Sequence, residues 1–376
     1  MAPSSDGAAL AGQPEALEDY RRELTGYCYR MLGSGFEADD AVQETMLRAW
    51  KSAGQFEGRS SVRSWLYRIA SNVCLDMLRG RQRRARPMEL GPASVPDESN
   101  LGQMLPEHMW VSPIADDRIL PVDADPAEIV EAKDTIRLAF VTALQHLPPR
   151  QRASMILCEV LRFQATEVAE LLGTTVPAVN SALQRARATL AAVPADSRPH
   201  DLQADHAELL NRYVDAFQRY DMSALVGLLH EDAVQSMPPY AMWIQGAEDV
   251  TTWMVQPGPS ACRGSRLIPV QANGSPAFGQ YKPDPAGGLA PWALQVLEIS
   301  GDRIARMTFF LDTAALFPSF GLPAHLPSAD SAFPGRTFPA PPGQLSRQLT
   351  RRTRAAGPGH SGALLPVKIR LSRAGI

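Results

Sequence analysis

Apolar residues recur at three- and four-residue spacing between about Pro14 and Arg84, which is the pattern of amphipathic helices. One stripe joins Tyr20, Leu24, Tyr27, Cys28 and Met31, and a second joins Val42, Met46, Leu47 and Trp50. Gly33 and Gly35 punctuate the first two helices, and residues 54–61 have the composition of a loop. The pattern predicts a helical bundle over residues 15–85, preceded by a disordered segment, residues 1–14.

Residues 86–127 break this periodicity. From residue 85 to 127 the chain holds seven prolines, which preclude long helices, and eight acidic residues against only Arg86 and Arg118. This composition predicts an extended acidic linker and not a further domain.

Helical periodicity returns from about Pro126, interrupted only by Pro148 and Pro149, and predicts a second all-α domain over residues 128–193. From residue 203 an amphipathic helix is followed by strand-like segments, the clearest being 292–299 and 303–311 around a Ser-Gly-Asp turn. These features predict an α+β domain over residues 203–320. Residues 331–376 hold eight Lys or Arg and no acidic residue, and we expect them to form a disordered basic tail.

The length of 376 residues favours two or three domains. The net charge of −3 does not indicate a nucleic-acid binder, but the charge is strongly segregated along the chain. The four cysteines lack metal-ligand spacing, so we expect buried thiols, no metal and no cofactor. We see neither a signal peptide nor an apolar run long enough to span a membrane, and we therefore expect a cytoplasmic protein.

The sharpest local motif is a helix-turn-helix over residues 165–184. Such a motif needs a small residue where its helices touch and a turn glycine, here Ala169 and Gly173. The face of the second helix left for DNA holds Ala178, Asn180, Ser181, Gln184, Arg185 and Arg187. The alternative is an ordinary helical hairpin whose polar residues face water.

Residues 63–86 contain seven arginines and a single acidic residue, Asp76, next to aromatic side chains. Cations that neutralise phosphates beside rings that stack on bases are typical of single-strand binding. The alternative is that Trp65 belongs to the core, which we favour for that residue, and that the arginines form a solvated helix end.

A third group, Glu37, Asp39, Asp40 and Glu44, gathers at the start of one helix. Acidic residues stabilise a helix N-terminus, so this group is either a favourable first turn or a docking surface for a basic helical partner.

Together these segments resemble the extracytoplasmic-function (ECF) sigma factors of the sigma-70 family, over residues 33–50, 56–84 and 147–190. The resemblance implies two partners, the RNA polymerase core, through its β′ and β subunits, and promoter DNA. It implies that core polymerase binds Asp39, Asp40, Ala41, Val42, Gln43 and Glu44. It implies that the −10 element is melted and read by Phe56, Arg63, Trp65, Tyr67, Arg68, Asn72, Arg79 and Arg83. The helix-turn-helix would read the −35 element.

The resemblance gives two features a further meaning. The acidic linker would lie in the positively charged RNA path of the polymerase, although a plain solvated tether is equally compatible with its composition. Relatives often have Lys or Arg in the middle of the recognition helix, where this chain has Asn180 and Ala182. Contacts to the −35 element are therefore expected to be weaker and less dependent on salt.

Residues 203–320 resemble the SnoaL-like domains fused to one subset of these sigma factors, which are α+β cones with an apolar pocket. Candidate pocket residues are Met237, Tyr240, Trp243, Trp253 and Trp292. Relatives of this fold include enzymes, but His230, Asp232, Asp312 and Tyr240 form no recognisable catalytic group, and His230 and Asp232 are expected at a helix end. We expect no catalysis, and hypothesise that this domain, with or without a small ligand, regulates the sigma domains in place of a separate anti-sigma protein.

Three classes of function remain: a dissociable initiation subunit, a ligand-responsive repressor or activator, and an enzyme with a DNA-binding appendage. Only the first explains both the acidic docking helix and the arginine-rich aromatic segment. A repressor typically gains affinity by dimerising on a palindrome, and an enzyme needs a competent acid or base.

Overall fold

The structure is a computed structural model that describes residues 15–192, 206–256 and 262–327, apart from Glu57, Arg59 and Asp123. The chain divides into two compact units, residues 1–337 and 338–376, and all described residues belong to the first. The predictions of disorder for residues 1–14 and 331–376 fall outside the described residues. No helix in the described part of the chain combines the length and apolar character needed to cross a membrane.

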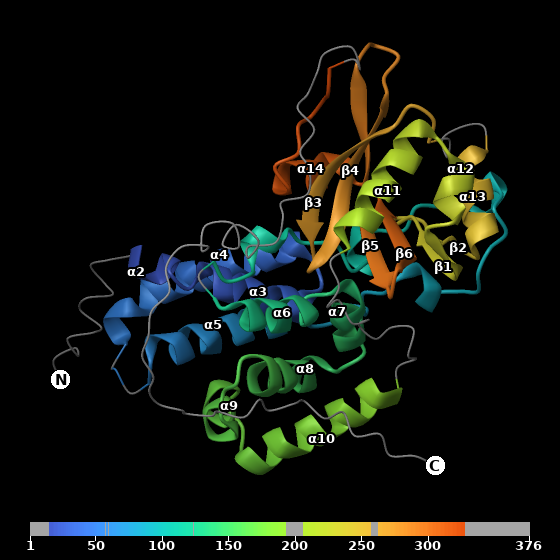
Figure 1. The fold of residues 1–376 in the computed structure, drawn as a ribbon. Coiled ribbons are helices and arrows are strands. Elements are labelled where there is room, and N and C mark those ends of the chain that lie inside the picture. The colour runs from blue at the N-terminus through green and yellow to red at the C-terminus, as the bar shows by residue number, and fades with distance from the viewer. Residues whose placement is uncertain are drawn as a thin grey trace, which may run out of the picture. The chain divides into compact units, whose positions relative to one another are not determined.

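The first helical module contains α2 (Glu15–Glu18), α3 (Arg21–Leu32), α4 (Gly35–Ser52) and α5 (Val62–Met77) (Figure 1). Helix α3 ends at Gly33, whose φ of +71° favours glycine, and the Ser34 side chain accepts the Glu37 N–H to begin α4. Helix α3 packs against both α4 and α5. The first apolar stripe is largely buried, but the second is split: Val42 is buried, whereas Leu47 and Trp50 are 42% and 55% exposed.

Ahead of α6, which begins at Pro126, the helical turns in the described part of the linker are three-residue 3₁₀ turns at Pro87–Glu89, Glu98–Asn100, Glu107–Met109 and Asp116–Arg118. The absence of longer helices in the described part of this segment fits its proline content. Trp110, Val111 and Ile114 are nonetheless buried, so this part of the linker packs into the molecule and is not a solvated tether.

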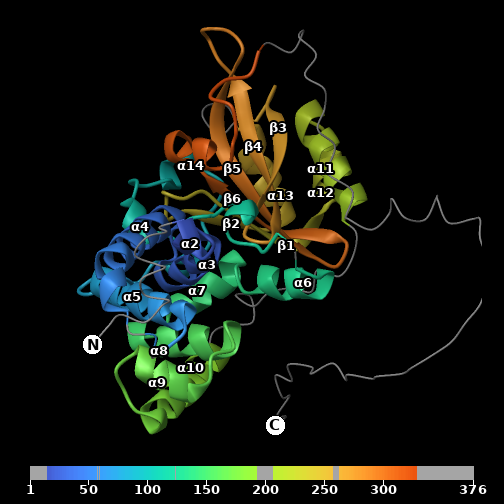
Figure 2. The same cartoon turned by 90° about the vertical axis from the view of Figure 1, so that its left-hand side faces the viewer.

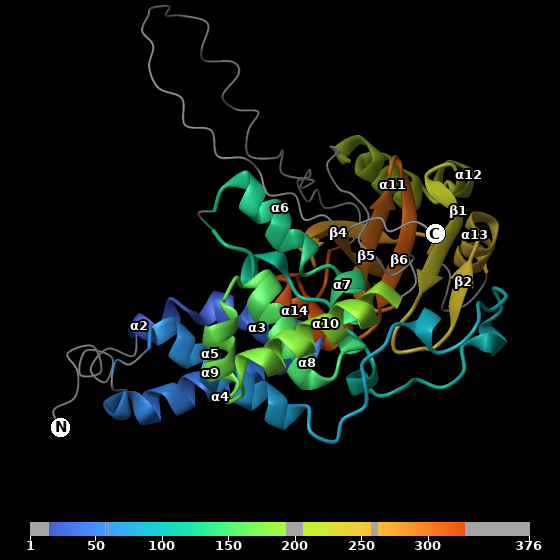
Figure 3. The ribbon, with the colours of Figure 1, turned by 90° about the horizontal axis from the view of Figure 1, so that it is seen from below.

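The second helical module contains α6 (Pro126–Asp134), α7 (Leu138–Gln145), α8 (Pro149–Met155), α9 (Ala165–Leu171) and α10 (Val176–Ala192). A single π-helical turn, Ile156–Val160, extends α8. Helices α8 and α9 both pack against α10, and Figure 3 shows α8 alongside α10. Residues of both helical modules share one apolar cluster with Ile114 of the linker.

The remaining described residues form the predicted α+β domain. Its strands are β1 (Leu229–Ser236), β2 (Trp243–Gln245), β3 (Arg266–Ala272), β4 (Ser275–Pro283), β5 (Leu289–Ser300) and β6 (Arg303–Phe310). The strand order is β2-β1-β6-β5-β4-β3, and only the β1–β6 pair of this sheet is parallel among the described residues. The two strands foreseen around the Ser-Gly-Asp turn are β5 and β6, and Gly301 takes the positive φ of +60° in that turn.

Four helices accompany the sheet in the described chain: α11 (Ala207–Arg219), α12 (Met222–Val226), α13 (Ala247–Val255) and α14 (Thr313–Ser319). Helices α11 and α14 lie on opposite sides of the sheet (Figure 2). Tyr213 of α11 packs against Phe278, and Phe317 of α14 against Tyr281. The sheet is thus buried on both faces, in agreement with the predicted α+β class.

Candidate nucleic-acid interface

The helix-turn-helix has the geometry that its sequence predicts. Gly173 takes a positive φ of +59° between α9 and α10, and the Thr175 hydroxyl accepts the Ala178 N–H at 3.4 Å, capping α10. Ala169 and Val179 are buried where the two helices meet. Local sequence signals are therefore sufficient to build this motif.

The side chains predicted to meet DNA lie on the outer face of α10. Ala178, Asn180, Gln184, Arg185 and Arg187 are exposed, and Ser181 is half-buried. The Arg185 guanidinium donates to the Ser181 hydroxyl at 2.8 Å, and Arg187 is ion-paired with Glu159. Ala182 is buried, so of the two positions where relatives often have a cation only Asn180 is on the surface.

The predicted −10 residues divide into three groups by their burial. Arg68, Asn72, Arg79 and Arg83 are exposed, Arg63 and Trp65 are half-buried, and Phe56 and Tyr67 are buried. Trp65 packs against Phe56 at a ring-centroid distance of 5.1 Å, which supports the interpretation of Trp65 as partly a core residue. Only the first group forms a surface available to a nucleic acid in this conformation.

The burial of Tyr67 has a definite cause, because the second helical module covers its ring. Phe163, just before α9, lies edge-on to Tyr67 at 5.2 Å between ring centroids. The Arg63 guanidinium lies 4.5 Å from the centre of the Phe163 ring and pairs with Glu23. One of the rings that would stack on unpaired bases, Tyr67, is therefore in contact here with the helix-turn-helix module.

The acidic group on α4 is likewise divided between surface and core. Asp40 and Gln43 are exposed, whereas Ala41 and Val42 are buried and have no surface to offer a partner. Leu47 and Trp50 follow Asp40 and Gln43 at helical spacing, so these four side chains share one exposed face. Asp39 is ion-paired with Arg118 of the linker and Glu44 with Arg48, so neither carboxylate is unpaired in this conformation.

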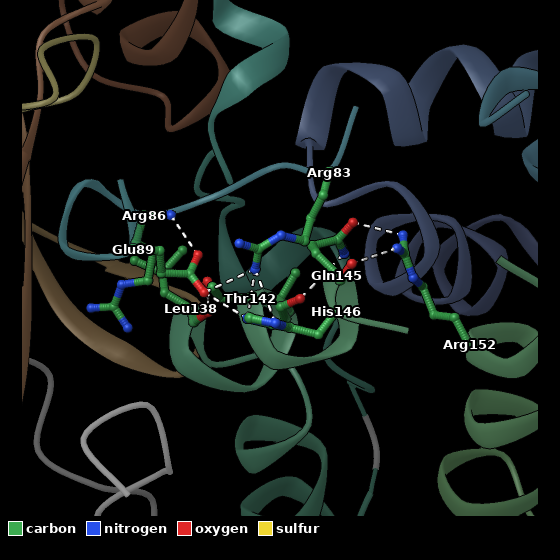
Figure 4. A network of polar contacts seen from close by, with 9 residues as sticks. Arg83, Arg86, Glu89, Leu138, Thr142, Gln145, His146 and Arg152 are labelled. Carbon is green, nitrogen blue, oxygen red and sulfur yellow. Dashed lines mark hydrogen bonds and ion pairs between the residues drawn. The ribbon is translucent and has the colours of Figure 1, made fainter. Parts of the chain in front are cut away.

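Polar contacts join the two helical modules at the place where the C-terminal end of the first module meets the end of α7 and the start of α8 (Figure 4). Buried Arg152 of α8 donates to the Met31 carbonyl of α3 and, at 2.6 Å, to Gln145 Oε1. Burial lowers the pKa of Arg152 to about 10, which leaves it charged at neutral pH. Nearby, Glu89 of the linker accepts from Arg83 at 3.0 Å and lies 2.6 Å from His146 Nε2.

Asn273, at the turn between β3 and β4, joins the α+β domain to the rest of the described chain. Its side chain is fully buried and accepts the Ile114 N–H at 3.0 Å. Its amide group donates at 2.6 Å to both the Tyr29 hydroxyl and the Ile136 carbonyl. One side chain thus contacts the first helical module, the linker and the segment that leads into α7.

Asp116 of the linker lies beside this turn. Its carboxylate accepts the Gly274 N–H at 2.7 Å, and its other oxygen has no hydrogen-bond partner among the described residues. Burial raises the pKa of Asp116 to about 6, although the Gly274 hydrogen bond and the charge of Lys133 act in the opposite direction. Gly274 has φ +66°, and a Cβ there would lie 2.8 Å from Lys133 Cβ, so the contact requires glycine.

A buried ion triplet forms a second contact between linker and sheet. Glu298 of β5 binds Arg86 of the linker at 2.6 Å and Arg306 of β6 at 2.9 Å. Burial acts to raise the pKa of Glu298, but the charges and hydrogen bonds of the two arginines outweigh it and lower the pKa to about 2. Glu298 therefore stays charged at neutral pH where the linker meets the sheet.

The interior of the α+β domain is crossed by a chain of hydrogen bonds. Tyr213 donates to Gln295, Gln295 to Gln280 and Gln280 to Ser265, at 2.8, 2.8 and 2.9 Å. Trp253 is buried, and Trp243 donates to the Gly91 carbonyl of the linker at 2.8 Å. A cavity of about 360 Å³ borders this domain between Trp110 and Pro239, but none of the five predicted pocket residues lines it.

The structure corrects one expectation about this domain. His230 and Asp232 lie within strand β1 and not at a helix end, so helix capping does not explain them. Asp312 does cap a helix, since its side chain accepts the Ala315 N–H at the start of α14. His230 Nδ1 accepts the Asp232 N–H at 3.2 Å.

The sequence patterns did not identify Arg152, Asn273 or Asp116 as structurally important. The Asn273-Gly274 dipeptide was a usable signal, because Asn-Gly is a favoured two-residue hairpin turn. Nothing in the local sequence marks Arg152 or Asp116, whose roles depend on contacts with residues distant along the chain.

Comparison with known proteins places these features in a family. The models of Sigma-70 region 2 and of Sigma-70, region 4 match residues 16–84 and 137–190. The ECF RNA polymerase sigma factor SigG of Mycobacterium tuberculosis is 46% identical over 314 residues, which are 82% of this chain and 83% of that protein. SigW of Bacillus subtilis is 30% identical over 48% of this chain and 89% of its own length.

A solved structure extends the likeness to the α+β domain. The crystal structure of the Mycobacterium tuberculosis extracytoplasmic function sigma factor SigJ matches with a TM-score of 0.51, over 82% of this chain and 99% of that one. At 23% identity this match shows the fold alone. Because the matched region covers 82% of this chain, it includes residues beyond the two helical modules. With the two sigma-70 regions and the extended identity to SigG, the chain belongs to the ECF RNA polymerase sigma factors.

Proposed function

We propose that this chain directs core RNA polymerase to promoters through three separate surfaces. These are the exposed face of α4, the exposed cationic residues of α5 and of the stretch that follows it, and the outer face of α10. The observation that supports this most is the pairing, in one chain, of an exposed recognition helix with an acidic and apolar docking face on α4. A repressor does not need the docking face on α4.

The docking face for the polymerase, in its β′ subunit, comprises Asp40, Gln43, Leu47 and Trp50. Exposed large apolar side chains beside charged ones are typical of protein interfaces, and tryptophan is enriched among the residues that dominate binding energy. Ala41 and Val42, which are buried, support this face from within.

The double substitution Asp40→Ala, Gln43→Ala is expected to weaken binding to core polymerase at least about tenfold, about 1.4 kcal/mol. The measurement is competition for fluorescently labelled core enzyme. The matched control is Glu208→Ala, Asn211→Ala, which removes an exposed acid and amide at the same spacing on α11. Equal affinities for the two variants would place the docking surface elsewhere.

Promoter reading is assigned to α10 for the −35 element and, for the −10 element, to the exposed residues of α5 and of the stretch that follows it. Replacing Arg185 and Arg187 by alanine is expected to lower the salt dependence of holoenzyme binding, by about one unit of slope for each phosphate that is no longer neutralised. Binding of holoenzyme to promoter DNA at several KCl concentrations measures this slope. Arg212→Ala, Arg219→Ala on α11 is the control, and a slope unchanged in both variants would remove these arginines from the DNA interface.

The conformation described here is a closed one that must open on promoter DNA. Positions −10 and −35 are 25 base pairs apart, or about 85 Å of B-form duplex at 3.4 Å per base pair. Helix α5 packs against α9, and Phe163 covers Tyr67, so the two reading surfaces lie too close together to reach both elements. Separation of the two helical modules is therefore part of the proposed activity.

The α+β domain is proposed to regulate this opening. It contacts the linker through Asn273, Gly274 and Glu298, and through Asn273 it also contacts Tyr29 of the first module. The Asn273 amide donates both to Tyr29 of the first module and to the Ile136 carbonyl of the second, and it can keep both bonds only while the modules are together, so the domain stabilises the closed conformation. As a family, sigma factors are not enzymes, and the absence of catalysis in the α+β domain stays a prediction.

Run-off transcription tests the function as a whole. Core polymerase supplied with this chain is expected to initiate from promoters selected with it, and to remain inactive without it. An activator or repressor working through DNA alone gives no initiation under these conditions, and that result would overturn the proposal. The cytoplasmic location stays a prediction.

A further inference from the structure

A cationic cavity of about 300 Å³ lies where the end of the first helical module meets the α7–α8 turn. Four arginines, Arg81, Arg83, Arg84 and Arg152, line it together with a single carboxylate, Glu37, among the described residues. His108 and His146 are also at its wall. This excess of positive charge is gathered by the closed conformation, because Arg152 comes from α8 and the other arginines from the stretch that follows α5.

The carboxylates nearby do not neutralise this charge. Glu37 is shared by Arg81 and Arg84, Glu89 pairs with Arg83, and Glu107 lies 3.7 Å from Arg84, so three carboxylates face four arginines. Within the described chain, Arg152 has no carboxylate at ion-pair distance and is held by the carbonyls of Met31, Gln145 and Leu147 and by Gln145 Oε1. A buried guanidinium without a counter-ion is costly, and like charges collected around one cavity repel each other. An anion in the cavity relieves both costs.

We propose that this cavity binds a small phosphorylated molecule and that its binding holds the two helical modules closed. Guanidinium groups match phosphate oxygens in pairs, and several arginines around one cavity suit a multiply charged phosphate better than a carboxylate. The volume is that of a small-ligand site. Leu32, Leu78, Pro148 and Pro149 form part of its wall, and among the described residues no Phe, Tyr or Trp ring lines it on which the bases of a nucleic-acid strand could stack.

The ligand would act on the equilibrium between closed and open forms. Because the wall is built from both modules, the site exists only when they are together, and a ligand selects that state. At a concentration 100 times its dissociation constant, a ligand of this kind shifts the equilibrium about 100-fold toward the closed form. This inference goes beyond the proposed promoter function and is tested on the free chain.

The experiment measures binding of inorganic phosphate, pyrophosphate and a nucleoside triphosphate to the full chain by calorimetry at low salt. Pyrophosphate or the nucleotide is expected to bind, with an affinity that falls as salt increases. The double substitution Arg81→Gln, Arg83→Gln should weaken binding at least about tenfold, since it removes two charged donors. The control Arg21→Gln, Arg48→Gln removes two exposed arginines that are also ion-paired with carboxylates but do not line the cavity.

A second variant separates loss of the site from loss of the fold. Glu37→Gln removes the carboxylate that lines the cavity, so it should tighten anion binding even if it loosens the protein. The proposal is overturned if the control pair weakens binding equally, or if Glu37→Gln binds the anion more weakly. It is also overturned if none of the three phosphates binds at millimolar concentration. Binding of single-stranded DNA alone overturns it as well, because that result would assign these arginines to the promoter surface.

Discussion

Replacing Asn273 by alanine is expected to release the α+β domain from the helical modules. The change removes the bonds to Ile114 N–H, the Tyr29 hydroxyl and the Ile136 carbonyl, and leaves these buried groups without their partner. Buried polar groups that lose a partner cost about 1–3 kcal/mol each, so we expect the domain contact to weaken by about 3 kcal/mol or more. Hydrogen exchange at the Ile114 amide measures this loss directly.

The same variant tests the regulatory role of the domain. If the contact stabilises the closed form, Asn273→Ala should bind core polymerase faster and give more run-off transcript than the unmodified chain. Asn211→Ala, an exposed asparagine on α11 of the same domain, is the control. If the Ile114 amide loses its protection from hydrogen exchange but transcription does not change, the contact has only a structural role. That result would contradict regulation through this contact.

Asp116→Asn is expected to remove a pH dependence of stability between about pH 4 and 6. An aspartate in the unfolded chain has a pKa near 3.9, and burial raises that of Asp116 to about 6. In this window the folded protein binds more protons than the unfolded chain, so the free energy of unfolding falls as pH rises, by up to about 3 kcal/mol. Stability from this group is complete below about pH 4 and lost above about pH 6.

The asparagine keeps the oxygen that accepts the Gly274 N–H but has no charge to lose. At pH 7 we expect a gain of about 2 kcal/mol, less than the full amount because the new amide hydrogens lack a partner. Thermal unfolding between pH 4 and 7 measures the slope. Asp117→Asn changes the exposed neighbour and should leave the slope nearly unchanged; an identical effect of both substitutions would refute the assignment to Asp116.

The elements that the sequence predicted well are those built by neighbouring residues. The helix-turn-helix follows from Gly173 and Thr175, which act within one turn of their own positions, and from Ala169, which is buried where the two neighbouring helices meet. The β5–β6 hairpin follows from alternation and from one glycine. Such signals are local, so a single sequence contains them.

The features that it missed depend on which distant segments meet. Tyr67 has the character of a base-stacking residue, but its burial depends on Phe163, which is 96 positions away. Prolines in the linker correctly excluded long helices, but gave no indication that Trp110 to Ile114 pack into the molecule. Acidic Asp39 suggested a surface for a partner, whereas the structure pairs it with Arg118. Local composition describes what a side chain can do and not what covers it.

The position of Phe163 over Tyr67 has a quantitative consequence for how the molecule responds to its surroundings. The closed form covers the Tyr67 ring that promoter binding needs, so the two states exclude each other. The closed population therefore lowers every measured affinity for promoter DNA in the same proportion. If the closed form is favoured over the open form by about 2.7 kcal/mol, only about one molecule in a hundred is open and able to bind promoter DNA. A change of about 1.4 kcal/mol in the free-energy difference between the closed and open forms then changes the amount of transcript about tenfold, without changing which promoter sequence is recognised.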